Sequence, residues 1–317
     1  MAEMRLTIQH GGVLYEPPVE SGVKLEWERS GSPGKLTFTV LKTPTLVFDE
    51  GDAVCFYYNG KGVFMGYVFK KKRDREHRIE VTCYDQIRYL KNKYTYVFQN
   101  KTADQIIRAL CMDFNLYTGR MDNTAYVIPA IAEENIAAID IALDVLEETL
   151  LNTGNMYILY DDFGKITLKN AATMISTRLV CETTAENFDY TSSIDDETYN
   201  SIILYYKNDD EKIQIFTAES KATISKWGTL RYFEEVKTPT IGQSKANALL
   251  KLYNQKTREL KVTGVFGDPT VRGGTLIPVV LNLGDIVTKN FMLVEKVTHN
   301  FEKDHYTMDL TLEGAWE

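Results

Sequence analysis

Clusters of acidic residues are the first feature of this sequence that could do chemistry. They lie at residues 161–162, 195–197 and 209–211. A glycoside hydrolase uses two carboxyl groups, held on either side of the scissile bond, for acid and base or nucleophilic work. At least two of these clusters fall at predicted hairpin turns, where Asp is favoured for local backbone reasons. Turn formation is therefore the preferred interpretation, and no catalytic residue is predicted.

Histidines near the C-terminus are the next candidates. His299 and His305 flank a charged turn that also contains Glu302 and Asp304. These residue types bind metals, but a site needs them to converge on one point, and a turn tip usually directs them into water. We therefore expect exposed histidines, with no metal and no cofactor.

The cysteines and the glycine-rich segment offer no better site. No CxxC pair occurs among the cysteines, and Cys83 alternates with apolar residues as a core residue would. Residues 267–274, GDPTVRGG, lack the Gly-Lys-Ser/Thr ending of a phosphate loop and precede a predicted strand. We expect reduced thiols and synthesis in the cytosol.

The basic stretch KKKRDREHR, residues 70–78, stands in an otherwise acidic chain. It lies between two predicted strands, so we expect a long hairpin tip. Two interpretations stay open, a solvated turn and an electrostatic contact with an acidic protein surface. Nucleic acid is not expected, because no aromatic residues for base stacking interleave the charges. The candidate interface residues are Lys70, Lys71, Lys72, Arg73, Arg75 and Arg78.

The elements around these residues are mainly strands. Residues 35–40 and 78–85 alternate apolar with polar side chains, and Asn59-Gly60 marks a hairpin. Residues 101–115 predict a helix with a capping box, Thr102 and Gln105. A second helix is expected to end at Gly154, and a hairpin to follow it. Strands return after residue 185, with one helix over residues 243–256.

The two ends of the chain repeat one pattern. Residues 64–85 and 291–313 both begin Phe-Met, pass a charged stretch and end as an alternating strand, which makes Phe64 equivalent to Phe291. We predict a mainly β protein with an α+β insertion. Its domains would be two related β-barrels, at residues 1–97 and 186–317, and a small α+β domain at residues 98–185.

Composition limits the class of protein. The 317 residues are 44% hydrophobic and 25% charged, as in a folded soluble protein. The net charge of −8 argues against binding by phosphate neutralisation and against an anionic membrane surface. We find no apolar signal-peptide core at the N-terminus and no apolar run of membrane-spanning length.

Several motifs in order resemble one family. These are FMGYV with its charged hairpin, EVTCYDQIRYLKNKY, the capped TADQIIRALC, ISKWGTLRYFEEV, GDPTVRGG and FMLVEKVTHNF. Together they resemble the baseplate hubs of contractile phage tails, Gram-positive prophages and R-type, phage-tail-like bacteriocins. The resemblance covers most of the chain.

The resemblance implies a structural protein made in the bacterial cytoplasm and assembled into a tail baseplate. Hubs of this family carry two tube-like barrels per chain, and three chains form a ring of six. Such a homotrimer adapts the six-fold tail tube to a three-fold spike. The implied partners are further copies of the chain, the tail tube or its initiator, the central spike and other baseplate proteins. Specific nucleic acid and membrane insertion are not implied.

Two alternatives of other classes remain open. One is a cell-wall hydrolase, acting on peptidoglycan or glycan, and the other is a cell-surface binding module on a β scaffold. A hydrolase should place a carboxylate or histidine in a cleft outside turns. A hub should instead form a trimer and lack activity on its own.

Overall fold

The computed structural model describes residues 3–314 except residues 21, 196, 209–210, 237, 285–286 and 304. The chain forms two compact units, residues 1–189 with 260–317, and residues 190–259. Strands dominate the described chain, so the predicted fold class, mainly β with an α+β insertion, is confirmed. The predicted domain limits at residues 97 and 185 stay a prediction.

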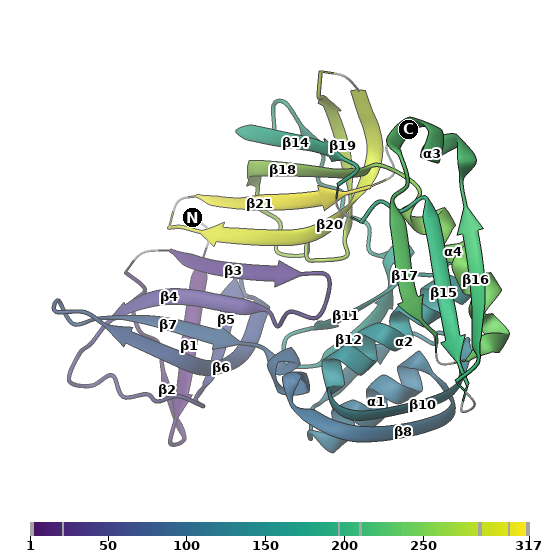
Figure 1. Ribbon diagram of the computed structural model, residues 1–317. Coiled ribbons are helices and arrows are strands. Elements are labelled where there is room, and N and C mark those ends of the chain that lie inside the picture. The colour runs from purple at the N-terminus through teal and green to yellow at the C-terminus, as the bar shows by residue number, and fades with distance from the viewer. Residues whose placement is uncertain are drawn as a thin grey trace. The chain divides into compact units, whose positions relative to one another are not determined.

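One large sheet contains most strands of the first unit, and two of its strands, β14 and β18, run on into residues 190–259 (Figure 1). Its path is β14-β18-β21-β20-β3-β4-β7-β6-β5-β1-β2, with β19 paired to β20 and β13 to β19. The N-terminal set is β1 (Met4–His10), β2 (Val13–Tyr15), β3 (Val23–Glu28), β4 (Lys35–Leu41), β5 (Ala53–Tyr58), β6 (Lys61–Arg73) and β7 (Arg78–Tyr84). The C-terminal set is β13 (Val180–Cys181), β14 (Asn187–Ser193), β18 (Thr257–Phe266), β19 (Leu276–Asn282), β20 (Val287–Phe301) and β21 (Tyr306–Glu313). The two sets join where residues 296–301 of β20 pair antiparallel with β3.

The two sets of strands repeat one topology. The neighbours β3-β4-β7-β6-β5 correspond to β14-β18-β21-β20-β19, and matching strands also follow each other in the same order along the chain. The next neighbour differs, since β1 pairs antiparallel with β5 and β13 pairs parallel with β19. The repeat expected from the two ends of the sequence is therefore present in the sheet.

The repeat extends to the register of single residues. In the β6–β7 pair one extra residue, Phe69, bulges between Val68 and Lys70, and in the β20–β21 pair Glu295 bulges between Val294 and Lys296. A bulge is a specific local feature, because it breaks the ladder and turns the strand at one position. The same bulge at the same place in both pairs is strong support for a common pattern.

A pair of glycines gives a second match. The Gly51 N–H donates to the Val68 carbonyl and the Gly274 N–H donates to the Val294 carbonyl, at 2.8 and 2.7 Å. Both glycines have a left-handed backbone, with φ of 95° and 88°. Only glycine adopts that conformation without steric cost, so both sets use glycine to start the strand that precedes the bulged strand.

The predicted residue equivalence is wrong by one position. Phe64 and Phe291 do lie in matching strands, but counting four residues back from Val68 and Val294 pairs Phe64 with Asn290. Phe64 is 2% exposed and Phe291 is 51% exposed. A shift of one residue moves a side chain to the opposite face of a sheet, and a shared Phe-Met dipeptide does not reveal such a shift.

Helices and short sheets lie between the two strand sets along the sequence. They are η1 (Gln86–Lys91), β8 (Lys93–Thr102), α1 (Ala103–Asp113), β9 (Thr118–Met121), β10 (Val127–Ala137), α2 (Ala138–Thr153), β11 (Tyr157–Asp161), β12 (Ile166–Asn170) and η2 (Ala171–Thr173). The capping box of α1 is confirmed, and Gly154 ends α2 with φ of 72°. Apolar faces of α1 and α2 form one core with strands β8, β10, β11 and β12. This core holds the hairpin of β11 and β12 that carries Asp161.

The second unit contains a small sheet of its own. Its elements are β15 (Ser201–Lys207), β16 (Ile213–Glu219), α3 (Lys221–Trp227), β17 (Arg231–Glu235), η3 (Pro239–Ile241) and α4 (Gly242–Tyr253). Strand β15 pairs antiparallel with β16 and parallel with β17. Residues 209 and 210 of the acidic cluster at 209–211 lie outside the described residues. Among the helices of the described chain, none has the length and apolar character to cross a membrane.

Candidate functional site

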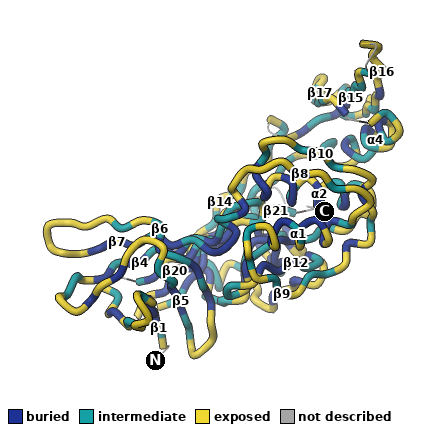
Figure 2. Tube along the Cα trace, turned by 90° about the horizontal axis from the view of Figure 1, so that it is seen from below, coloured by how far each residue is buried: buried dark blue, intermediate teal, exposed yellow. Residues whose placement is uncertain are grey.

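The basic stretch lies mostly in a strand, which corrects the prediction of a long hairpin tip. Residues 70–73 are the end of β6, and only residues 74–77 form the turn to β7. Asp74 tightens this turn, because its Oδ1 accepts the N–H groups of Glu76 and Arg78. The sequence suggested a tip because charged residues seldom fill a strand, whereas here residues 70, 72 and 73 of the strand end are exposed and residue 71 is half-buried (Figure 2).

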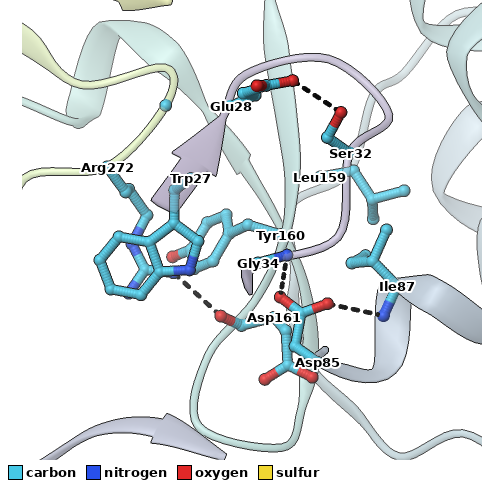
Figure 3. A pocket seen from close by; sticks show the side chains of 11 residues that line it. Trp27, Glu28, Ser32, Gly34, Asp85, Ile87, Leu159, Tyr160, Asp161 and Arg272 are labelled. Carbon is cyan, nitrogen blue, oxygen red and sulfur yellow. Dashed lines mark hydrogen bonds between the residues drawn. The ribbon is translucent and has the colours of Figure 1, made fainter. Parts of the chain in front are cut away.

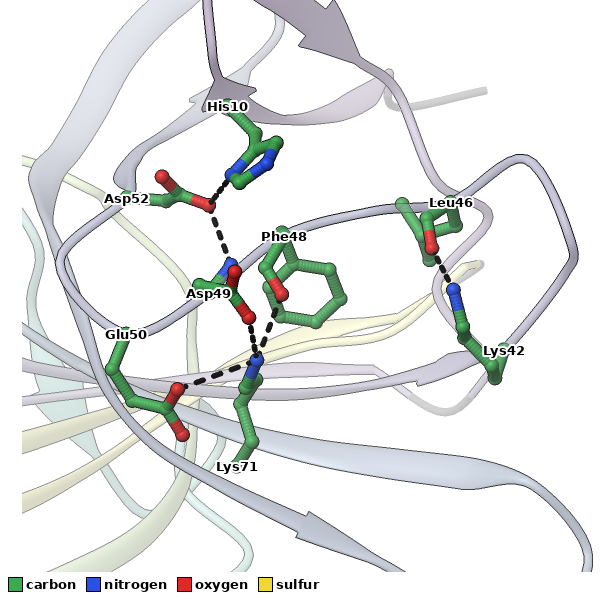
Figure 4. Close-up of polar contacts among 8 residues, drawn as sticks. All are labelled: His10, Lys42, Leu46, Phe48, Asp49, Glu50, Asp52 and Lys71. Carbon is green, nitrogen blue, oxygen red and sulfur yellow. Dashed lines mark hydrogen bonds and ion pairs between the residues drawn. The ribbon is translucent and has the colours of Figure 1, made fainter.

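Lys71 is committed to contacts within the chain (Figure 4). Its Nζ donates to the Phe48 carbonyl at 2.7 Å and to Asp49 Oδ1 at 2.8 Å, and it lies 3.3 Å from Glu50 Oε2. It also lies 5.1 Å from the centre of the Phe48 ring. Burial lowers the pKa of Lys71, but hydrogen bonds to both carboxylates outweigh that effect and raise it. Lys71 therefore anchors the loop before β5 rather than facing a partner.

The other basic side chains divide into two groups. Arg78 pairs with Glu20 at 2.9 Å and with Glu76 at 2.6 Å, and Arg73 contacts the Nδ1 atom of His77 at 2.6 Å. Among the six candidate residues, all of which the structure describes, Lys70, Lys72 and Arg75 are exposed and make neither an ion pair nor a side-chain hydrogen bond, and exposed Arg73 makes no ion pair and contacts only His77. The charges of these four side chains are not neutralised by a carboxylate within the described chain.

A second polar site lies buried where three segments of the first unit meet (Figure 3). Asp85 follows β7, Asp161 ends β11, and Arg272 belongs to the GDPTVRGG segment before β19. The Arg272 guanidinium lies over the rings of Trp27 and Tyr160, 4.6 and 4.3 Å from their centres. Its Nη1 donates to the backbone carbonyl of Asp161 at 2.9 Å. We call Asp85, Asp161 and Arg272, with these two rings, the junction.

Each carboxyl oxygen of the junction already has a donor. Asp85 accepts the N–H groups of Gly34 and Ile87 at 2.8 and 3.0 Å. Asp161 accepts the Gly164 N–H on one oxygen, and the backbone and side-chain N–H groups of Gln86 on the other at 3.3 Å. The turn role predicted for Asp161 is thus confirmed by Gly164, but Asp161 is also 6% exposed, which the turn interpretation did not foresee.

Burial sets the protonation of the pair. It raises the pKa of Asp85 well above its usual range, and the neighbouring Asp161 carboxylate raises it further. Burial also raises the pKa of Asp161, while hydrogen bonds from Gly164 and Gln86 and the charge of Arg272 oppose the rise. Two acids with raised pKa values can mark an active site. Here, however, the carboxyls hold backbone groups in place, and the arrangement suits a structural clamp.

The GDPTVRGG segment is part of this clamp. A Cβ atom on Gly273 would lie 2.4 Å from the Arg29 nitrogen and 2.5 Å from the Glu28 carbonyl carbon, so the segment touches the backbone at the end of β3. Gly274, next to it, lies against the side chain of Ile158 in β11. The segment that resembled a phosphate loop therefore joins both strand sets to the β11–β12 hairpin.

His299 corrects another expectation. The side chain lies on β20 and is fully buried, not at a turn tip. Its Nδ1 lies 2.8 Å from the Tyr306 hydroxyl and its Nε2 2.9 Å from the Val271 carbonyl. Burial lowers its pKa to about 3, so the ring is neutral at pH 7. A neutral ring that donates from Nε2 and accepts on Nδ1 satisfies both neighbours.

Metal ligands do not gather in the described residues. No group of three or more His, Cys, Asp or Glu side chains is placed to hold an ion there. Asp304, between the two histidines of the predicted turn, lies outside the described residues. The junction was missed in the sequence because its members are 76 and 111 residues apart, and no local pattern links them.

Solved structures share this fold. The 43 kDa tail protein of prophage MuSo2 from Shewanella oneidensis has a TM-score of 0.74 and 14% identity, covering 97% of this chain and 98% of that chain. The E. coli c3393 protein, a component of the type VI secretion system described as structurally similar to the T4 tail proteins gp27 and gp5, has a TM-score of 0.61 and 12% identity, covering 98% of this chain and 77% of that chain. The fold is therefore that of phage tail and baseplate proteins.

The sequence itself places the chain more narrowly. It matches the YQBQ-like family over residues 23–313. YqbQ of Bacillus subtilis, an uncharacterized protein, is 31% identical over 92% of this chain and 91% of its own length. The PBSX phage-like element protein XkdQ of the same organism is 32% identical over the same shares. The chain belongs to the YQBQ-like family, and the predicted relation to phage baseplate proteins is confirmed.

Proposed function

We propose that this chain is the structural hub of a contractile tail baseplate, in a phage or a tail-like particle. Three copies form a ring of six matching strand sets, and this ring joins a six-fold tail tube to a three-fold spike. The observation that carries the proposal is the repeat within one sheet, with the same strand order, the same bulge and the same glycine contact.

Symmetry explains why a duplicated chain suits this role. Closed rings require the same contact surface at every position. A chain with two matching strand sets presents nearly the same surface twice, so three chains offer six similar surfaces to the tube. The same three chains still offer three identical surfaces to the spike. The fold of tail and baseplate proteins supports this use of the repeat.

The junction supports a structural role over the hydrolase alternative. Its carboxyl groups are buried and each oxygen accepts a hydrogen bond from the chain itself. A hydrolytic pair would need oxygens directed at a substrate from opposite sides of a cleft. We therefore propose that the chain is not an enzyme, and that Asp85→Asn and Asp161→Asn variants alter stability rather than any lytic activity.

The copy number of the chain in a purified particle tests the proposal. Cryo-electron microscopy of the baseplate, with quantitative mass spectrometry as an independent count, should give three copies. Contacts between subunits should bury more than about 2,000 Å² each, as in obligate assemblies. Cross-linking mass spectrometry should connect the chain to the tube and spike proteins. A baseplate with any other copy number would refute the hub role.

A further inference from the structure

Strands β6 and β20, which carry the matching bulges, differ in the strands that lie beside the residues after the bulge. Residues 296–301 of β20 pair with β21 on one side and with β3 on the other. The matching residues of β6, 70–73, pair with β7, but β5 stops pairing at Tyr67. Beyond Val68, no described strand lies along the other side of β6. One matching edge is therefore paired with a strand, whereas the other has no strand partner among the described residues and is approached only by the loop residues 48–50, which contact the Lys71 side chain.

The backbone groups of the open edge point outward in the same register. The Asp74 N–H donates to the Arg78 carbonyl at 3.1 Å. Because hydrogen-bonded and non-bonded pairs alternate in an antiparallel ladder, residues 70 and 72 also bond β7, while residues 71 and 73 direct their N–H and C=O groups away from it. In β20 the Glu302 N–H donates to the His305 carbonyl, so residues 297 and 299 face β3 by the same count. Residues 71 and 73 of β6 correspond to these two.

A complementary open edge exists at the end of the sheet path. Strand β14 corresponds to β3, because β3 pairs with β4 and β14 pairs with β18, the strand that matches β4 in the repeat. Strand β3 pairs with β4 and β20, whereas β14 pairs only with β18 among the described strands. The end of β6 therefore matches β20 but has no partner that corresponds to β3. Strand β14 matches β3 but has no partner that corresponds to β20.

Charge also matches between these two edges. Residues 70–78 contain six Lys or Arg side chains, and residues 179–206, which include β14, contain no Lys or Arg. The acidic residues of that segment are Glu182, Glu186, Asp189, Asp195, Asp196 and Glu197. Complementary charge favours correct docking and fast association more than it adds affinity. A basic strand end and an acidic strand segment fit this pattern.

We propose that residues 69–73 of β6 pair antiparallel with β14 of a second copy, as β20 pairs with β3 within the chain. The inference rests on the trimer proposed above and names its contact. The contact is heterologous, because one edge meets a different edge, and such contacts close into a ring when the rotation allows it. Three of these joints would alternate with the three β20–β3 joints inside the chains. The competing explanation is that the lysines of β6 keep this edge from pairing with any other strand. In that case the edge of β6 would stay unpaired in the particle.

Two substitutions at Arg73 separate backbone pairing from charge. Arg73→Pro removes an N–H that no strand of the described chain uses, and proline is tolerated where an edge N–H faces solvent. Arg73→Ser removes the same side chain but keeps the N–H. Circular dichroism and the melting temperature of the isolated chain should be alike for both variants. Incorporation into baseplates should fall about tenfold more for Pro than for Ser, as expected for losing a backbone bond and adding a steric clash. Equal incorporation would overturn the proposed pairing.

A disulfide test remains valid even if the proline variant does not fold. Cys181 would first be changed to Ser, because hydrogen bonds from Thr183 and Thr184 lower its pKa to about 7 and make it reactive. Arg73→Cys would then be combined in turn with Phe188→Cys, Tyr190→Cys and Ser192→Cys, since a disulfide needs Cα atoms within about 7 Å. Oxidised particles should give covalently linked copies with one or more pairs.

The control and the outcomes keep the two proposals apart. Arg73→Cys combined with Lys101→Cys, an exposed residue of β8, should give no linked copies. Particles with three copies but no linkage from any β14 position would overturn the edge pairing and leave the hub role standing. A copy number other than three would instead refute the hub role.

Discussion

Replacing Arg272 tests whether the junction stabilises the first unit. Arg272→Ala removes two cation–π contacts, each worth about 1 kcal/mol at a partly buried site. It also removes a hydrogen bond from a charged donor to the Asp161 carbonyl, worth about 1.5–3 kcal/mol. Since neighbouring terms are not additive, we expect the free energy of unfolding to fall by about 3 kcal/mol.

A lysine variant and a more exposed arginine, Arg178, serve as controls. Arg272→Lys keeps the charge but loses the planar guanidinium, so it should recover about half of the loss. Arg178 pairs with Asp268 at 3.5 Å, and its side chain is 49% exposed. Arg178→Ala should therefore cost less than about 1 kcal/mol. Urea unfolding at pH 7, followed by both circular dichroism and tryptophan fluorescence, measures all three variants, and coincident transitions justify a two-state fit.

The pH dependence adds a sharper criterion. Arg272 lowers the pKa values of Asp85 and Asp161, so its removal raises them further. A carboxyl whose pKa is raised by folding stabilises the protein below its unfolded pKa of about 4, and that stability is lost as the pH rises toward the folded pKa. The effect of Arg272→Ala should thus be larger at pH 8 than at pH 5. An effect as small as that of Arg178→Ala, or one independent of pH, would show that the junction does not act as a clamp.

Three further predictions follow from buried positions. Gly273→Ala should destabilise the chain by at least about 2 kcal/mol, because its Cβ meets backbone atoms that cannot move aside, whereas Gly314→Ala, 3.4 Å from a flexible methionine side chain, should be nearly neutral in the same urea assay. In the wild-type chain the free energy of unfolding should fall as the pH rises above about 4, because the buried Asp85 carboxyl must ionise. Asp85→Asn should make this fall less steep, by at most about 1.4 kcal/mol per pH unit. An unchanged dependence of stability on pH would contradict the raised pKa of Asp85. NMR should show the His299 imidazole still neutral at pH 5, because burial lowers its pKa to about 3. The free energy of unfolding should fall as the pH drops below about 6.5, the pKa of histidine in the unfolded chain. Titration of the imidazole near pH 6.5 would disprove its burial in solution.

The sequence by itself determined the elements and their repetition. Alternating side chains placed the strands, Asn59-Gly60 placed the β5–β6 turn, and Gly154 placed the end of α2. These signals are local, because a strand's period and a turn's backbone angles depend on residues a few positions apart. The repeat of whole segments was also visible, since it preserves order along the chain. The same order carried the resemblance to baseplate proteins.

The tertiary structure alone decided register, burial and pairing. A one-residue offset between Phe64 and Phe291 changes which face is buried, yet leaves the local pattern almost unchanged. Asp161 is the turn residue that the sequence predicted, but only the packing of β11 places it beside Asp85 and Arg272. His299 was expected to be exposed, but Trp27, Val271 and Tyr306 pack around it and bury it. The free energy of a buried charge or of an open strand edge depends on neighbours far along the chain, and only the packed sheet specifies those neighbours.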